Sequence, residues 1–181
     1  MTALILLLVL LVIASATDIA THHISNRLTY PGILLGLLCN AAGLGVLGNG
    51  WDGLLAGLLG FLGCGFLVLA AFVFFEIGGG DVKLIAMLGA FLGVEAGIEA
   101  LLWTFSVGFV CGVSIVIWQA GFTNLVRRGI EHLALVAKAR GWVPLTPAER
   151  QPLQRGLFLA PSALVAAVIV SWPTLVRPYL S

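Results

Sequence analysis

Two aspartates stand at the ends of long apolar segments, where a carboxyl group is costly and therefore indicates a function. Asp18 closes the first apolar segment of the chain, and Asp81 opens the fourth. Two carboxyl groups brought together cannot both ionise cheaply, so one keeps its proton while the other stays charged. The charged member can activate a water molecule, and the neutral member can protonate a carbonyl oxygen or a leaving amine. Such a pair can hydrolyse a peptide bond without a metal or a nucleophilic side chain, whereas two solvated interfacial charges would have no such role.

Three glycines, Gly78, Gly79 and Gly80, directly precede Asp81. Without Cβ atoms they can adopt positive φ angles and let the backbone of a substrate approach closely. A flexible turn between two helices would have the same sequence, so both interpretations stand at this point.

The composition is that of an integral membrane protein. Of 181 residues, 60% are hydrophobic and only 9% are charged, with a net charge of +1 and a mean hydropathy of +1.11. A soluble domain carries roughly 25% charged residues. The low charge excludes a disordered chain and a basic surface for nucleic acid.

The apolar segments predict an all-α, six-helix membrane bundle, because their lengths approach the roughly 20 residues that cross a bilayer. The predicted spans cover residues 2–17, 31–47, 54–75, 82–99, 101–118 and 157–172. The fourth carries Glu95 and Glu99 in its last turns, which indicates a short helix that ends at an interface. Glycines at four-residue spacing, such as Gly89, Gly93 and Gly97, predict close packing between helices.

Basic residues orient the six spans, since cytoplasmic loops carry an excess of Lys and Arg. With the N-terminus outside, the outer side holds only Arg177, and Asp18 and Asp81 both lie at the inner face. The inner side then holds the remaining basic residues, which are Arg27, Lys83, Arg127, Arg128, Lys138, Arg140, Arg150 and Arg155.

The segment before the last predicted span and the start of the first span need separate interpretation. Residues 122–140 have the spacing of an amphipathic helix on the inner membrane surface, and the proline-containing residues 141–154 predict an irregular loop. Residues 4–14 look like the apolar part of a signal peptide, but no basic residue precedes them. We therefore expect the first helix to be retained as a span.

Two motifs resemble those of the type IV prepilin peptidases, which are polytopic aspartyl proteases of the GxGD class. In that family the first aspartate precedes an Ile-Pro-Asn-like tripeptide by six residues, as Asp18 precedes Ile24-Ser25-Asn26 here. The second aspartate lies in GxGD followed by Val-Lys, as in GGGDVKL at 78–84. The motifs lie within about the first half of the chain, and the six-span arrangement extends the resemblance to its end. Ser25 replaces the usual proline, and neither residue transfers a proton.

The resemblance implies one membrane peptidase domain over residues 1–181, with Asp18 and Asp81 as the catalytic pair and no cofactor. The implied substrate is a prepilin or pseudopilin in the lipid bilayer, cut after a glycine at the cytoplasmic face of a bacterial-type inner membrane. Bifunctional members carry a cytoplasmic insertion, commonly with CxxC motifs, that is associated with N-methylation. Only a short loop separates the first two spans here, so the chain resembles the compact peptidases of Flp (tight-adherence) pili, and methylation is not expected. Self-association is left open.

Further polar residues near the two motifs are candidates for active-site support or substrate binding, together with the three glycines. Lys83 could tune the pair or bind substrate, although a lysine at the inner interface often extends its charge to water without further role. Asn26 could position its loop or meet the substrate. Glu76 could contact the basic residues of a leader peptide, or could be an interfacial charge that closes the third span.

A metal site is not expected. His22 and His23 follow Asp18, but the sequence has no HExxH and too few well-placed donors. Three cysteines form no CxxC pair and lie in apolar segments, which predicts small buried thiols; they are Cys39, Cys64 and Cys111.

Two other functions fit the same composition. A small transporter could use Asp18 and Asp81 to bind a cation or relay protons, and a non-catalytic assembly factor would need only the glycine packing faces. The absence of a repeat between the two halves of the sequence argues against the transporter. Substitution of either aspartate separates the alternatives, because a protease would lose cleavage and an assembly factor would tolerate the change.

Overall fold

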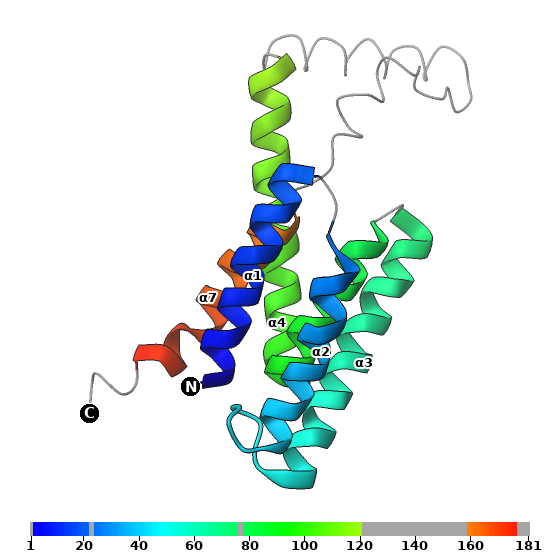
Figure 1. Ribbon diagram of the computed structural model, residues 1–181. Helices are drawn as coiled ribbons and strands as arrows, with labels where there is room; N and C mark the ends of the chain where they lie inside the picture. Colours follow the sequence, from blue (N-terminus) through cyan, green and yellow to red (C-terminus); the bar gives the residue numbers. More distant parts are fainter. Residues whose placement is uncertain (1, 22–23, 76–77, 121–158, 177–181) are drawn as a thin grey trace. The chain divides into compact units, whose positions relative to one another are not determined.

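The computed structural model describes residues 2–21, 24–75, 78–120 and 159–176, and all regular structure in these ranges is helical (Figure 1). This confirms the all-α class. The helices are α1 (Thr2–Thr21), α2 (Asn26–Ala41), α3 (Gly50–Phe75), α4 (Gly79–Ala120) and α7 (Leu159–Val176).

Three of these helices are long and apolar enough to cross a membrane, over Thr2–Thr21, Gly50–Ala71 and Gly79–Ile115. α7 contributes a shorter apolar helix over Leu159–Thr174. These lengths indicate a multi-pass membrane protein. The predicted surface helix and loop at 122–154 lie outside the described residues.

The chain divides into two compact units. The larger comprises Met1–Val107 and Phe158–Ser181, and it contains α1, α2, α3, most of α4 and α7. The smaller comprises Gly108–Leu157, of which the structure describes only the end of α4. Every residue discussed below as part of a site belongs to the larger unit.

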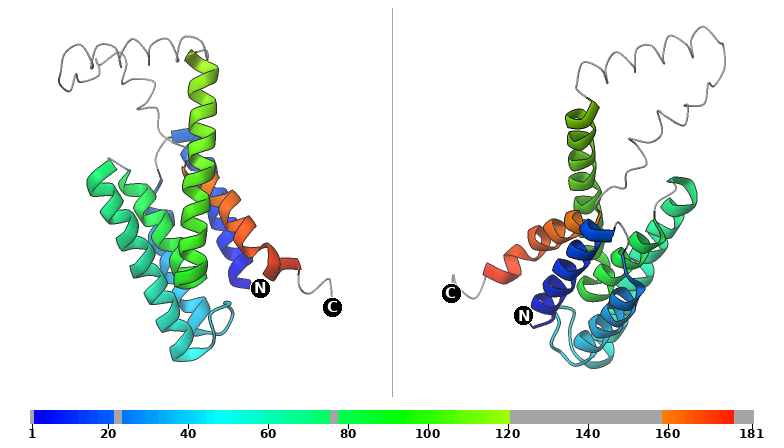
Figure 2. Two further views of the ribbon diagram at one scale, coloured as in Figure 1. Left: turned by 180° about the vertical axis from the view of Figure 1, so that it is seen from behind. Right: turned by 45° about the horizontal axis from the view of Figure 1, so that its top comes forward.

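The start of α4 is the centre of the larger unit. Every residue from 84 to 93 is buried, as expected for a helix that is apolar on all sides. Leu84, Met87 and Phe91 of this stretch form one core with Leu7 and Leu11 of α1. Around it, α7 packs along α1, α1 along α2, and α2 along α3 (Figures 1 and 2).

α4 is interrupted at Gly93, where φ is +79° and ψ is −170°. This backbone conformation favours glycine, which has no Cβ. The chain turns back there, because a Cβ added to Gly97 would lie only 3.2 Å from the Cα atom of Gly89. The predicted boundary between spans 82–99 and 101–118 is therefore wrong. Glu95 and Glu99, which suggested a helix end, follow the interruption and are exposed.

Asn40 of α2 satisfies backbone groups that the interruption frees. Its Nδ2 donates hydrogen bonds to the carbonyl oxygens of Ala90, at 2.9 Å, and Phe91, at 3.3 Å. Helix ends leave carbonyl groups without partners inside the helix, and these groups are costly in an apolar core. The fully buried Asn40 side chain thus stabilises the end of the first part of α4.

Helices α3 and α4 approach most closely through two glycines. A Cβ added to Gly60 would overlap the carbonyl oxygen of Gly89, and a Cβ added to Gly89 would overlap that of Gly60. Small residues permit this backbone approach between membrane helices. The spacing of the glycines predicted a packing role for Gly89, whereas Gly60 has no glycine four residues away and was not predicted.

We predict that Gly60→Ala destabilises the protein by about 1–3 kcal/mol, the usual cost of extra volume in a packed core. Gly63→Ala is the matched control, because it lies in the same helix and a Cβ there would meet nothing within 4 Å. Thermal unfolding in detergent micelles should show a lower midpoint for Gly60→Ala and an equal or higher one for Gly63→Ala. Equal midpoints for the two variants would contradict the close packing of α3 on α4.

Candidate active site

Four helix ends meet at one end of the larger unit. α1 ends there, and α2, α4 and α7 begin there, at the level of the upper ends of α1, α2 and α7 in Figure 1. The arrangement follows from helices that alternate in direction along the chain. It brings Asp18, in the last turn of α1, to the same level as Asp81, in the first turn of α4.

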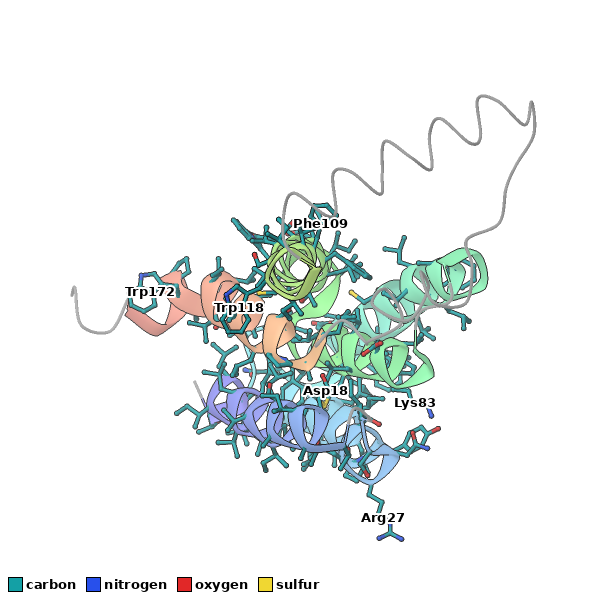
Figure 3. All side chains as sticks on the ribbon, turned by 90° about the horizontal axis from the view of Figure 1, so that it is seen from above. Asp18, Arg27, Lys83, Phe109, Trp118 and Trp172 are labelled. Carbon is teal, nitrogen blue, oxygen red and sulfur yellow. The ribbon has the colours of Figure 1, made fainter. Side chains whose placement is uncertain are left out.

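Asp18 is a buried carboxylate. Its side chain is 7% exposed, and it continues the buried face of α1 formed by Leu7, Leu11 and Ala14. Its Oδ2 accepts a hydrogen bond from the backbone N–H of Ala160 in the first turn of α7, at 3.3 Å. Viewed from above, Asp18 lies among the helices, away from the periphery (Figure 3).

Asp81 is held by the start of its own helix. The N–H groups of Asp81 and Val82 donate to the carbonyl oxygen of Gly78, at 3.0 and 3.4 Å. The backbone of Gly78 in turn hydrogen-bonds the Asp81 carboxylate. The bond from Gly78 to the carboxylate is one half of a capping box, because glycine has no side chain to supply the other half. Asp81 is half-buried beside Gly78, with its carboxylate directed back over the helix start.

The two carboxyl groups lie within range of an electrostatic interaction with each other. They come from two helices that are far apart in the sequence. Two carboxyl groups with unlike surroundings, one buried against α7 and one half-buried against Gly78, can divide the roles of acid and base between them.

The glycine triplet owes its close contacts to missing side chains rather than to positive φ angles. Positive φ occurs in the described residues at Gly43, Gly48, Gly50 and Gly93, so the expected positive φ before Asp81 is not found there. A Cβ on Gly78 would lie 2.8 Å from Oδ2 of Asp81, and one on Gly80 would lie 3.1 Å from the Cβ of Ile24. A Cβ on Gly79 would meet nothing within 4 Å.

The tripeptide Ile24-Ser25-Asn26 starts α2 and ties it to α4. Ile24 is buried against Gly80. Ser25 is the N-cap of α2, and its Oγ accepts from the N–H of Arg27 at 3.3 Å. Serine is a favoured residue at this position. The cap explains why α2 begins at Asn26 rather than at the predicted residue 31.

Lys83 contacts α2. Its Nζ donates to Oδ1 of Asn26 at 2.7 Å and lies 5.1 Å from the centroid of the Tyr30 ring. Lys83 and Arg27 lie at the periphery, unlike Asp18 (Figure 3). The structure thus joins two of the predicted support residues to each other and gives Lys83 a role in positioning α4 against α2.

Several other predicted residues have different outcomes. Glu76, His22 and His23 lie outside the described residues. Within the described ranges, no three His, Cys, Asp or Glu side chains gather as a metal site would require. The prediction of buried thiols holds for Cys64, whereas Cys39 is half-buried and Cys111 is exposed.

The contact from α7 was not anticipated. Pro161 is a sequence signal for the start of a helix, because proline is tolerated in the first turn. Nothing in the sequence indicates that this start would meet Asp18, since the two are 142 residues apart.

Comparison with known proteins gives two matches. The model of the type IV leader peptidase family matches residues 5–113. A prepilin leader peptidase/N-methyltransferase of Bacillus subtilis (strain 168) is 36% identical over 109 residues, which are 60% of this chain and 42% of that protein. The chain thus spans less than half the length of this relative. No solved structure matches. Asp18 and Asp81 lie inside the range of the family match, and α7 lies outside it.

We predict that Asn26 and Lys83 are coupled in stability. Removing either side of a hydrogen bond to a charged group should cost about 1–2 kcal/mol at this partly exposed position. In a double-mutant cycle of Asn26→Ala and Lys83→Met, the double variant should lose less than the sum of the single losses. The control cycle uses Arg27→Met in place of Lys83→Met, since it removes an equal charge from a side chain that points away from the helices. Additive losses in the Asn26 and Lys83 cycle would show that the two residues do not stabilise the protein together.

Proposed function

Because the chain belongs to the type IV leader peptidase family, we propose that it is an aspartyl endopeptidase that removes leader peptides from type IV prepilins or pseudopilins. The observation that carries this proposal is the pairing of Asp18 and Asp81 at the meeting point of α1 and α4. Both residues lie in the matched range, and carboxyl groups at the end of an apolar bundle are costly and therefore indicate a function.

The proposed reaction uses one charged and one neutral carboxyl group. The charged group takes a proton from water while the water oxygen bonds to the scissile carbonyl carbon. The neutral group hydrogen-bonds the carbonyl oxygen, which gains negative charge as the tetrahedral intermediate forms. When the carbon–nitrogen bond breaks, the carboxyl group that took the proton from water gives it to the leaving nitrogen. The nitrogen departs as an amine, the other product is a carboxylic acid, and the pair again has one charged and one neutral member.

The proposed site faces the cytoplasm, at the inner boundary of a six-span bundle whose N-terminus is outside. Three helices that are long and apolar enough to cross a membrane, and the turn of α4 at Gly93, are compatible with several spans. The distribution of Lys and Arg in the sequence favours this orientation. A prepilin whose basic leader stays in the cytoplasm, and whose apolar helix lies in the bilayer, would then present its bond at the level of Asp18 and Asp81. We propose cleavage after a glycine at that level.

A compact Flp-type peptidase without methyltransferase activity fits the short connection between the first two helices. α1 ends at Thr21 and α2 begins at Asn26, so no cytoplasmic insertion separates the two. The Bacillus subtilis relative is named for both activities, but this chain covers 42% of that protein. The proposal is therefore limited to proteolysis.

We predict that Asp18→Asn and Asp81→Asn each lower prepilin cleavage at least about a hundredfold, because each removes an acid or base from the reaction. The assay is co-expression of an Flp-type prepilin in membranes, read by gel shift and N-terminal sequencing at equal enzyme abundance. Asp52→Asn is the matched control, since Asp52 lies in the first turn of α3, away from the pair, and is exposed.

Cleavage by the wild type and by Asp52→Asn, but not by Asp18→Asn or Asp81→Asn, would establish that the pair is catalytic. Processing by either of the other variants would show that the pair is not catalytic. Failure of the wild type on several prepilins would favour a transporter or an assembly factor.

We also predict that Gly78→Ala lowers cleavage about tenfold to a hundredfold, because an added Cβ displaces the Asp81 carboxylate from its position. Gly79→Ala places the same methyl group one residue later, in open space, and should cleave nearly as the wild type does. The ratio of the two cleavage rates, with thermal unfolding measured in parallel, is the readout. Equal rates would mean that the position of Asp81 beside Gly78 is unimportant for the reaction.

A further inference from the structure

Asp18 occupies an unfavourable place in its own helix for a negative charge. It lies in the last turn of α1, whose carbonyl groups make this end of the helix partly negative. It is also 7% exposed, so water gives it little stabilisation. A buried charge persists only where hydrogen bonds or an opposite charge compensate it.

The N-terminus of α7 supplies this compensation. The Ala160 N–H that bonds Oδ2 of Asp18 belongs to the first turn of α7, where amide groups have no partner inside the helix. This end of a helix is partly positive and favours anions. The next residue, Pro161, has no backbone N–H group and therefore cannot replace Ala160 as a donor.

Small side chains bring the start of α7 close enough to α1 for this contact. Ala160, Ala163 and Ala167 are fully buried in the core that α7 shares with α1. α7 therefore packs along α1 with its backbone near its neighbour, and the Asp18 carboxylate meets the amide end of α7 as a capping side chain would.

We propose that the start of α7 is a positioning element of the active site, in which the Ala160 N–H holds Asp18 as the charged member of the pair. Two charges side by side repel, so with Asp18 charged the proton of the pair stays on Asp81. Asp18 is then the base that activates water, and Asp81 is the acid that protonates the substrate. This inference rests on the proposed peptidase function, and it adds a helix that lies outside the range of the family match.

The test removes the N–H donor at position 160 while the residue stays in the first turn of α7. Ala160→Pro lacks the N–H, and proline is tolerated in a first helical turn. The matched control is Leu159→Pro, which places the same ring one residue earlier and leaves the Ala160 N–H intact. With a purified prepilin in detergent micelles, Ala160→Pro should lower kcat about tenfold to a hundredfold, the effect of losing one hydrogen bond to a charged group. Its KM should be unchanged, because Ala160 does not touch the substrate, and Leu159→Pro should keep a kcat near that of the wild type.

A second measurement does not require Ala160→Pro to fold. Infrared difference spectra between the wild type and Asp81→Asn report the carboxyl group that carries the proton. The proposal expects the protonated-carboxyl band of the pair to be absent in Asp81→Asn. A band that persists in Asp81→Asn and disappears in Asp18→Asn would place the proton on Asp18 and overturn the proposal.

The kinetic outcomes distinguish this inference from the proposed function. Equal kcat for Ala160→Pro and Leu159→Pro, with the wild type active, would overturn the role of α7 and leave the peptidase standing. A wild type that cleaves no prepilin would overturn the proposed peptidase function. The infrared spectra would still decide whether Asp18 is the charged member of the pair.

Discussion

The supply of backbone N–H groups at helix starts is the constraint on which the candidate site depends. The chain has few charged side chains, and the buried polar side chains of the described residues besides Asp18 are Ser, Thr and Asn. The first turn of a helix is a further source of donors for a buried carboxyl group. Asp81 uses the start of its own helix through Gly78, and Asp18 uses the start of α7 through Ala160. The site therefore lies where helix starts converge.

At the other end of the first part of α4, carbonyl groups need hydrogen-bond donors. There the interruption at Gly93 frees carbonyl groups, and the amide of Asn40 donates to two of them. The first part of α4 thus has hydrogen-bond partners at both ends. Gly78 bonds the Asp81 carboxylate at its start, and Asn40 of α2 bonds carbonyl groups at its end. With both ends satisfied and Gly89 packed on Gly60, this helix can hold Asp81 at a fixed height.

Much of this arrangement was predictable from the sequence, and the exceptions have physical reasons. Hydropathy predicted the helices, and the alternation of their directions predicted that Asp18 and Asp81 share one end. The interruption at Gly93 was not predictable, because that glycine has the same four-residue spacing as the glycines at packing faces. The contact of Ala160 with Asp18 depends on how α7 packs against α1, which helix periodicity does not specify. The role of Ser25 as an N-cap was also missed, although a serine directly before a helix is a known start signal.

The bond between Asp18 and Ala160 joins α1 to α7 across 142 positions of sequence. A ribosome delivers Asp18 to the membrane well before Ala160. Until α7 has inserted, Asp18 lacks the Ala160 donor, and the proposed arrangement of the pair is incomplete. A growing chain without α7 would therefore carry both aspartates without the proposed active arrangement, and assembly of α7 would act as a checkpoint on proteolysis in the membrane.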